Sequence, residues 1–187
     1  MTTHNRHWIE GGIFLAGFAA CIPLANYMIG HVGTVCVPEG PCLIPVGFGL
    51  TAPSGVLLVG LALVLRDLVQ RRLGLIWAIG AIIAGAFLST TFTAPALAFA
   101  SAVAFLTSEF VDLFVFTPLQ RKGLIKAAFA SSVAGLVVDS VMFLWLAFGS
   151  LDFVAGQIIG KLIMVVAALP VLLWIRNRDR KLGLLPA

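Results

Sequence analysis

The segment from Ala96 to Phe116 places the strongest constraint on how this chain can fold. It is apolar and long enough to cross a bilayer, which takes about 20 residues, yet Glu109 and Asp112 lie inside it. A carboxylate at the centre of a bilayer costs roughly 3 kcal/mol on insertion scales. Because the two acids are one helical turn apart, they share a face of the helix. We therefore expect a spanning helix whose acidic face meets polar partners or a ligand.

The composition extends this expectation to the whole chain. Hydrophobic residues make up 60% of the 187 residues, and the mean hydropathy is +1.08. A soluble domain of this length still exposes about a third of its unfolded surface, so it cannot hide so much apolar area. We predict a single all-α integral membrane domain, residues 1–187, with six transmembrane helices. The predicted spans cover residues 9–29, 50–69, 75–92, 96–116, 124–148 and 153–175.

The ends of these spans predict the orientation of the protein. The first apolar run continues past Cys21, which favours a retained span over a cleaved signal peptide. All of the 12 Lys and Arg residues except Lys161 lie at span ends that share one side of the membrane if six spans alternate. The positive-inside rule then places both termini in the cytoplasm. The net charge of +4 therefore reflects orientation, and no nucleic-acid partner is expected.

Two ionisable residues are predicted to meet between the last two spans. Asp139 and Lys161 lie at equal sequence distances from Ser150, in the turn that joins these spans. In an antiparallel hairpin, equal counts from the turn give equal depth. Gln157 lies one turn from Lys161 on the same face. The pair is either a structural ion pair or part of a polar site lining a cavity, and we favour the site because intramembrane ionisable groups are usually functional.

A second polar layer is expected nearer the cytoplasm. It contains Arg66, Asp67, Glu109 and Asp112, and Arg66 is placed to neutralise one of the acids. The alternative is an interfacial acidic cluster neutralised by Arg66 and the basic residues Arg121 and Lys122. That alternative is stronger for Asp112 than for Glu109. Asn26 is expected at the outer end of the first span.

Other sequence features leave alternatives open. Cys36 and Cys42 flank a short loop segment, and the sequence does not decide whether they form a disulfide. A small-residue stripe of Gly12, Ala16 and Ala20 is expected to allow close helix packing within the protein or to dock a partner. No nucleotide-binding, metal-ligand or nucleophile motif is present, so we expect no cofactor, no bound metal and no enzymatic activity.

Several segments together resemble the queuosine-precursor transporter family, also called the vitamin-uptake-type (VUT) family of six-span membrane proteins. They are Asn26-Tyr27, Ala52-Pro53-Ser54-Gly55, the LRDLVQ segment at 65–70, the SEFVD segment at 108–112, Thr117-Pro118-Leu119, Asp139 and Gly160-Lys161. The resemblance implies import of 7-cyano-7-deazaguanine or a related 7-deazapurine across the inner (plasma) membrane, for use in tRNA modification. It also implies functional roles for Asn26, Glu109, Asp112 and Asp139.

The residue types suit such a cargo. A guanine-like ring presents two adjacent N–H donors, which one carboxylate accepts as a bidentate pair. Glu109 or Asp139 is expected in this role. Asn26, Gln157 or Lys161 is expected to address the carbonyl and the nitrile, and a Phe or Trp145 to stack on the ring.

Three other functions compete with the importer. The runner-up is a substrate-capture subunit of an energy-coupling importer for a vitamin or nucleobase, which would need a coupling partner. An intramembrane enzyme and a purely structural assembly protein are weaker alternatives. The sequence does not specify the driving ion, the exact cargo, or whether the protein forms a homo-oligomer.

Overall fold

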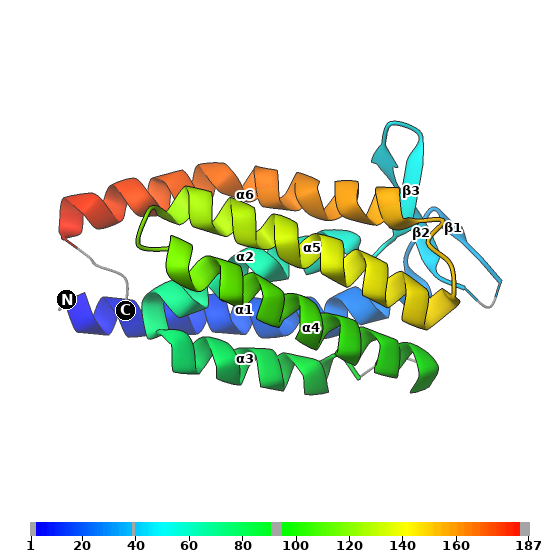
Figure 1. Cartoon of the computed structure of the whole chain (residues 1–187), viewed down its shortest axis with the longest axis horizontal. Helices are drawn as coiled ribbons and strands as arrows, with labels where there is room; N and C mark the ends of the chain where they lie inside the picture. Colours follow the sequence, from blue (N-terminus) through cyan, green and yellow to red (C-terminus); the bar gives the residue numbers. More distant parts are fainter. Residues whose placement is uncertain (1–2, 39, 91–94, 184–187) are drawn as a thin grey trace.

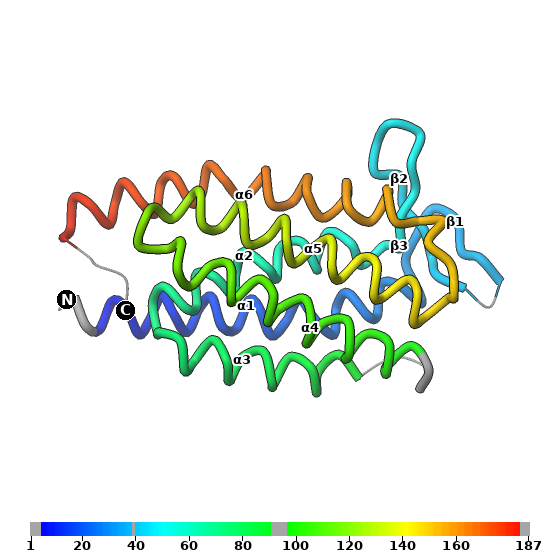
Figure 2. Tube along the Cα trace, viewed as in Figure 1, coloured from blue at the N-terminus to red at the C-terminus, as the bar shows by residue number. Residues whose placement is uncertain are grey.

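The computed structural model describes residues 3–38, 40–90 and 95–183. Within them the chain forms an elongated bundle of helices with a small β-sheet at one end (Figure 1). The helices are α1 (Thr3–His31), α2 (Val56–Leu73), α3 (Leu75–Leu88), α4 (Pro95–Leu119), α5 (Leu124–Phe148) and α6 (Val154–Leu182). The start of α1 and the end of α6 lie together at the end of the bundle opposite the sheet (Figure 2).

Glycines set several of the helix boundaries that the sequence predicted. Gly123 precedes α5 and Gly149 follows it, and both have positive φ (147° and 64°), which is unfavourable for other residues. The predicted fifth span therefore matches α5. Gly74, with a φ of 92°, separates α2 from α3 in the same way.

The beginning of the predicted second span is wrong. Leu50–Pro53 is a strand, β3, which pairs antiparallel with β2 (Cys42–Gly47), and β2 in turn pairs with β1 (Val35–Cys36). By hydropathy alone, a short apolar run is equally compatible with a strand and with a helix. Here its pairing with β2 makes it a strand. A tight turn at Gly47, Phe48 and Gly49, all with positive φ, joins β2 to β3. A disulfide links Cys36 to Cys42 across β1 and β2, which answers the question that the sequence left open.

The fold is that of an all-α polytopic membrane protein with this one small sheet. Four helices are long and apolar enough to cross a membrane by length and composition: α1 (from Asn5), α4 (from Leu97), α5 and α6. The apolar helix α3 has 14 residues, and α2 carries charged residues in its second half. Large apolar side chains on the outside of the bundle suit contact with lipid; they include Ile76, Phe87, Phe114 and Trp174.

The small-residue stripe on α1 does not pack inside the protein. Gly12, Ala16 and Ala20 are all exposed, and a Cβ added at Gly12 would meet no atom within 4 Å. The close contact on α1 is made instead by Gly11, where a Cβ would lie 2.4 Å from the side chain of Leu73 on α2. Helix packing within the protein is therefore the wrong interpretation of the stripe.

Candidate functional site

A cavity of about 50 Å³ lies within the bundle toward the sheet end. Its walls are mainly apolar and include the rings of Phe105 and Phe143. Its polar lining comes from four helices and from Ser89, which follows α3: Asn26, Ser89, Ser101, Ser108, Glu109, Asp139, Gln157 and Lys161. Five of the six residues predicted to bind substrate therefore line one cavity, and the sixth, Asp112, does not.

Lys161 organises the α5–α6 side of the cavity. Its ammonium group donates to Asp139 Oδ2 at 2.6 Å, Gln157 Oε1 at 2.6 Å and Ser140 Oγ at 2.9 Å. The equal counts from the turn correctly placed Asp139 and Lys161 together. An ammonium has three N–H donors, so all of them are occupied and none is left for a ligand. Lys161 therefore orients Asp139 and Gln157 and neutralises a buried carboxylate.

The position of Lys161 is fixed by a close approach of two helices. A Cβ added at Gly60 on α2 would lie 2.7 Å from the backbone oxygen of Lys161 on α6. Only a glycine leaves room for this contact. The α2–α6 packing thus determines where the ammonium group lies.

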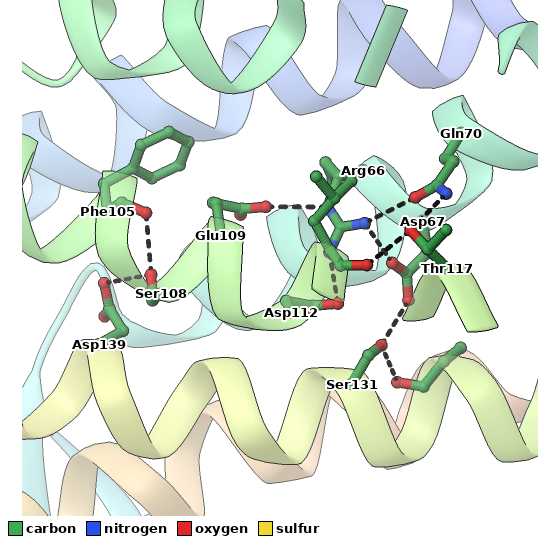
Figure 3. A network of polar contacts seen from close by, with 12 residues as sticks. Arg66, Asp67, Gln70, Phe105, Ser108, Glu109, Asp112, Thr117, Ser131 and Asp139 are labelled. Atoms are coloured by element: carbon green, nitrogen blue, oxygen red, sulfur yellow. Dashed lines mark hydrogen bonds and ion pairs between the residues drawn. The ribbon is translucent and has the colours of Figure 1, made fainter. Parts of the chain in front are cut away.

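Glu109 lies on α4 between the cavity and a second cluster of charges (Figure 3). Its Oε2 accepts a hydrogen bond from Arg66 Nε at 3.0 Å, and no other described residue donates to its carboxylate. The Oγ of Ser108, the residue before Glu109, lies 3.4 Å from Asp139 Oδ1 and so connects the two sides of the cavity. Oε1 of Glu109 therefore remains available as an acceptor at the cavity wall.

Arg66 joins three carboxyl groups in the second cluster. Besides Glu109, it forms ion pairs with Asp67 at 2.9 Å and with Asp112. All four side chains are at most 2% exposed. The two polar layers expected from the sequence are therefore joined through Glu109.

Sequence reasoning missed the neutral members of the Arg66 cluster. Gln70 accepts from Arg66 at 3.2 Å and donates to Thr117 at 3.0 Å, and Ser131 donates to Asp67 at 3.0 Å. Gln70 lies one turn after Arg66 on the same helix, and this spacing was the available signal. No comparable signal identified Ser131, because its partner lies on another helix.

Asn26 connects α1 to Ser89, which follows α3, and to Ser101 of α4. Its amide nitrogen donates to the backbone oxygen of Ser89 at 2.5 Å, and its oxygen accepts from Ser101 at 3.3 Å. Ser89 directly follows α3, which ends at Leu88. Asn26 is thus held in place by two neighbouring helices.

The predicted stacking role of Trp145 is wrong. Its side chain is on the outside of the bundle, with 61% of its surface exposed, and it does not line the cavity. The aromatic walls come from Phe105 on α4 and Phe143 on α5. The available signal was the spacing to Asp139, because Phe143 lies one helical turn after it on the same face of α5.

A third ionic cluster lies at the end of the bundle where α1 begins and α6 ends. Asp179 on α6 accepts hydrogen bonds from Arg71 and Arg72 of α2, at 2.8 to 3.3 Å. Glu10 of α1 accepts from Arg72 at 2.9 Å and from Arg178 at 2.5 Å. The sequence predicted these basic residues at span ends and indicated no partners for them, but they tie α1, α2 and α6 together.

Comparisons with known proteins identify the family. A family model described as "Putative vitamin uptake transporter" matches residues 74–175, which include α3, α4, α5 and most of α6. No curated protein and no solved structure matches the chain. The matched range contains Glu109, Asp139 and Lys161, the charged residues that line the cavity. The chain therefore belongs to the vitamin-uptake-type family of membrane transporters.

Proposed function

We propose that this protein imports a flat molecule with adjacent N–H donors, and specifically 7-cyano-7-deazaguanine or a related 7-deazapurine. The observation that carries this proposal is the Glu109 carboxylate, held by Arg66 on one oxygen and free on the other, at the wall of an apolar cavity. Such a pocket, with apolar walls and a few convergent polar groups, is typical of small-molecule sites.

The polar groups of the cavity favour a ligand that donates hydrogen bonds. Glu109 Oε1 has no donor among the described residues, and Asp139 Oδ1 has only the distant Ser108 hydroxyl. Carboxylates accept from adjacent N–H groups, as in the N1–H and exocyclic amine of a guanine-like ring. The Gln157 amide nitrogen has no acceptor among the described residues and suits a carbonyl or nitrile, because its oxygen is taken by Lys161. Phe105 and Phe143 supply apolar contacts for the ring faces.

Import requires that the cavity change size. Its volume of about 50 Å³ has room for a few water molecules, whereas small-molecule pockets are usually about 300 Å³ or more. The helices therefore move apart on one side to admit the cargo, and alternating access follows from such movement about a central site. Pro53, which lines the cavity, and Pro118, inside α4, are candidate hinges.

The proposal includes an arrangement in the membrane. Residues 1–187 form one integral domain of the inner (plasma) membrane, with six spans and both termini in the cytoplasm. The cluster of basic residues at the end of the bundle where α1 starts and α6 ends supports this orientation. The imported base then serves tRNA modification.

Uptake of labelled 7-cyano-7-deazaguanine by cells that lack other importers tests the function. We expect wild-type protein to support uptake and Glu109→Gln to reduce it about tenfold or more, because hydrogen bonds to charged groups contribute roughly 1.5–3 kcal/mol. Asp152→Asn, which alters an exposed carboxylate outside the cavity, is the matched control. Unchanged uptake in Glu109→Gln would remove this residue from the mechanism.

The exposed stripe of Gly12, Ala16 and Ala20 supports a second candidate, a substrate-capture subunit that docks a coupling partner. Purified protein in liposomes separates the two functions, since a complete importer exchanges substrate alone whereas a capture subunit only binds it. Replacing Ala16 with leucine would impair uptake in cells only if this face contacts a partner or a second copy.

A further inference from the structure

The cavity and the adjoining Arg66 cluster contain more acidic groups than basic ones. Arg66 and Lys161 are the cations of the cavity and the adjoining cluster, whereas Asp67, Glu109, Asp112 and Asp139 are the acids. If all four acids were ionised, two negative charges would remain uncompensated in this region, because the buried Arg71 and Arg72 pair with Asp179 instead. Uncompensated buried charges cost several kcal/mol each, so protons or another cation must be bound there.

Of the four acids, Asp112 has the fewest hydrogen-bond donors for its carboxylate. It is fully buried, the Arg66 guanidinium contacts its Oδ1, and its Oδ2 has no hydrogen-bond donor among the described residues. By contrast, Asp67 accepts from Ser131, Asp139 accepts from Lys161, and Glu109 accepts from Arg66. A buried acceptor without a donor is unfavourable, and protonation of the carboxylate removes both its charge and one acceptor.

The surroundings of Asp112 are defined by three helices. Arg66 and Asp67 face it from α2, and Glu109 lies one turn away on α4. On α5, Gly135 lies against it, since a Cβ added there would be 3.1 Å from Asp112 Cβ. The charged residue that α5 contributes to the interior, Asp139, pairs with Lys161 of α6.

A proton fits this site better than a metal ion. The guanidinium of Arg66 already contacts all three carboxyl groups of the cluster and repels a second cation. No group of three or more metal-ligating side chains in the described part of the chain is arranged to hold a metal. A proton needs no coordination shell, because it forms an O–H bond with one carboxylate oxygen.

We propose that Asp112 binds the proton that drives import. This inference rests on the proposed import function and adds the coupling ion. A proton from water on the outer side forms an O–H bond with Asp112, enters with the substrate, and returns to water on the cytoplasmic side when that bond breaks. No electron transfer or further reactant is involved.

Glu109 couples the proton to the substrate. It shares Arg66 with Asp112, and it also lines the cavity. A proton on Asp112 removes a negative charge near Glu109 and so favours the anionic carboxylate that accepts the N–H groups of the substrate. By thermodynamic reciprocity, bound substrate increases the affinity of Asp112 for its proton.

Reconstituted protein in liposomes tests the coupling with labelled 7-cyano-7-deazaguanine. We expect exchange of internal for external substrate without any gradient, and accumulation of about tenfold per pH unit for one proton per neutral substrate. A protonophore abolishes accumulation but not exchange. Asp112→Asn, which resembles the protonated acid, retains exchange and loses accumulation, whereas Asp152→Asn retains both. Wild-type accumulation that is driven by sodium, or that persists in Asp112→Asn, would overturn the inference while leaving import intact.

Infrared spectroscopy tests the proton site without transport. We expect carbonyl stretches of protonated carboxylic acids in wild-type protein at neutral pH, and the loss of one of them in Asp112→Asn. A band lost in Asp67→Asn, with every band persisting in Asp112→Asn, would overturn the assignment. If wild-type protein shows no exchange, the import function and its coupling both fail, and the infrared bands still decide whether Asp112 holds a proton. If Asp112→Asn does not fold, accumulation by wild-type protein, measured with a protonophore and with a sodium gradient, still shows whether protons drive import.

Discussion

At the scale of single residues, the cavity separates groups that bind from groups that position. Lys161 has three acceptors for its three donors, so its role is to hold Asp139 and Gln157 in place. Glu109 has one oxygen held and one free, which makes it the group most suited to a ligand. A residue's unused hydrogen-bonding capacity, more than its charge, therefore indicates its part in recognition.

The Asp139–Lys161 pair gives a stability prediction. We expect Lys161→Met to lower the free energy of unfolding by about 3–5 kcal/mol, because it leaves the Asp139 carboxylate buried without its cation. The double variant Lys161→Met with Asp139→Asn should be less destabilised than either single variant. Thermal unfolding in detergent measures this non-additivity. Strictly additive effects would show that the two groups do not depend on one another.

The relative contributions of Asp139 and Glu109 to substrate affinity give a second prediction at this scale. The single variant Asp139→Asn should weaken substrate binding less than Glu109→Gln does. The reason is that Asp139 Oδ2 already accepts a hydrogen bond from the ammonium group of Lys161. Ligand-induced thermal shifts with 7-cyano-7-deazaguanine provide the comparison. A larger loss for Asp139→Asn would make Asp139 the principal acceptor.

At the scale of helices and strands, close backbone contacts determine where the polar groups meet. Gly60 allows α2 to approach α6 at Lys161, and Gly135 allows α5 to approach α4 at Asp112. Both glycines lie at helix crossings that carry the charged clusters. The polar chemistry of the bundle thus depends on small residues that take no part in it.

Replacing Gly60 tests this dependence. Gly60→Val should separate α2 from α6, cost about 1–3 kcal/mol of stability and reduce uptake, because the added side chain meets the backbone of Lys161. Gly80→Val is the control, since a Cβ there meets no atom within 4 Å. Thermal unfolding and uptake are measured on both. Equal behaviour of the two variants would show that the α2–α6 contact is not limiting.

The sequence predicted where helices begin and end better than it predicted which face of each helix points inward. Gly123 and Gly149 made the ends of α5 readable, and the turn at Ser150 gave the pairing of Asp139 with Lys161. In contrast, Trp145 was placed wrongly although Phe143, one turn after Asp139, shares the polar face of α5. The α1 stripe was placed wrongly because the apolar middle of α1 gives no sequence signal for its inward face. The sharing of Arg66 by three acids depends on packing among helices, which no single sequence segment encodes.

At the scale of the whole molecule, the chain has two structurally distinct ends. The sheet with its Cys36–Cys42 disulfide lies at one end, and the Arg72–Asp179 cluster lies at the other. Disulfides persist in oxidising compartments, and basic residues accumulate on the cytoplasmic side. Both features support the same orientation.

Reporter fusions test this orientation. A fluorescent protein that matures only in the cytoplasm should be active when fused after Ala187, and one inserted after Phe48, in the turn between β2 and β3, should be inactive. Alkylation with a membrane-impermeant thiol reagent in whole cells, after reduction, should label Cys36 and not Cys21, which is buried. The opposite pattern of fluorescence would invert the proposed topology.

The ionic cluster that ties α1, α2 and α6 has a kinetic consequence. Asp179 accepts four hydrogen bonds from two arginines, and Glu10 accepts two more, so separating these helices breaks several charge-assisted contacts at once. In the proposed orientation this end faces the cytoplasm. For the proposed import cycle we therefore expect discharge of cargo into the cell, and not its capture from outside, to be the slow step that sets the turnover rate.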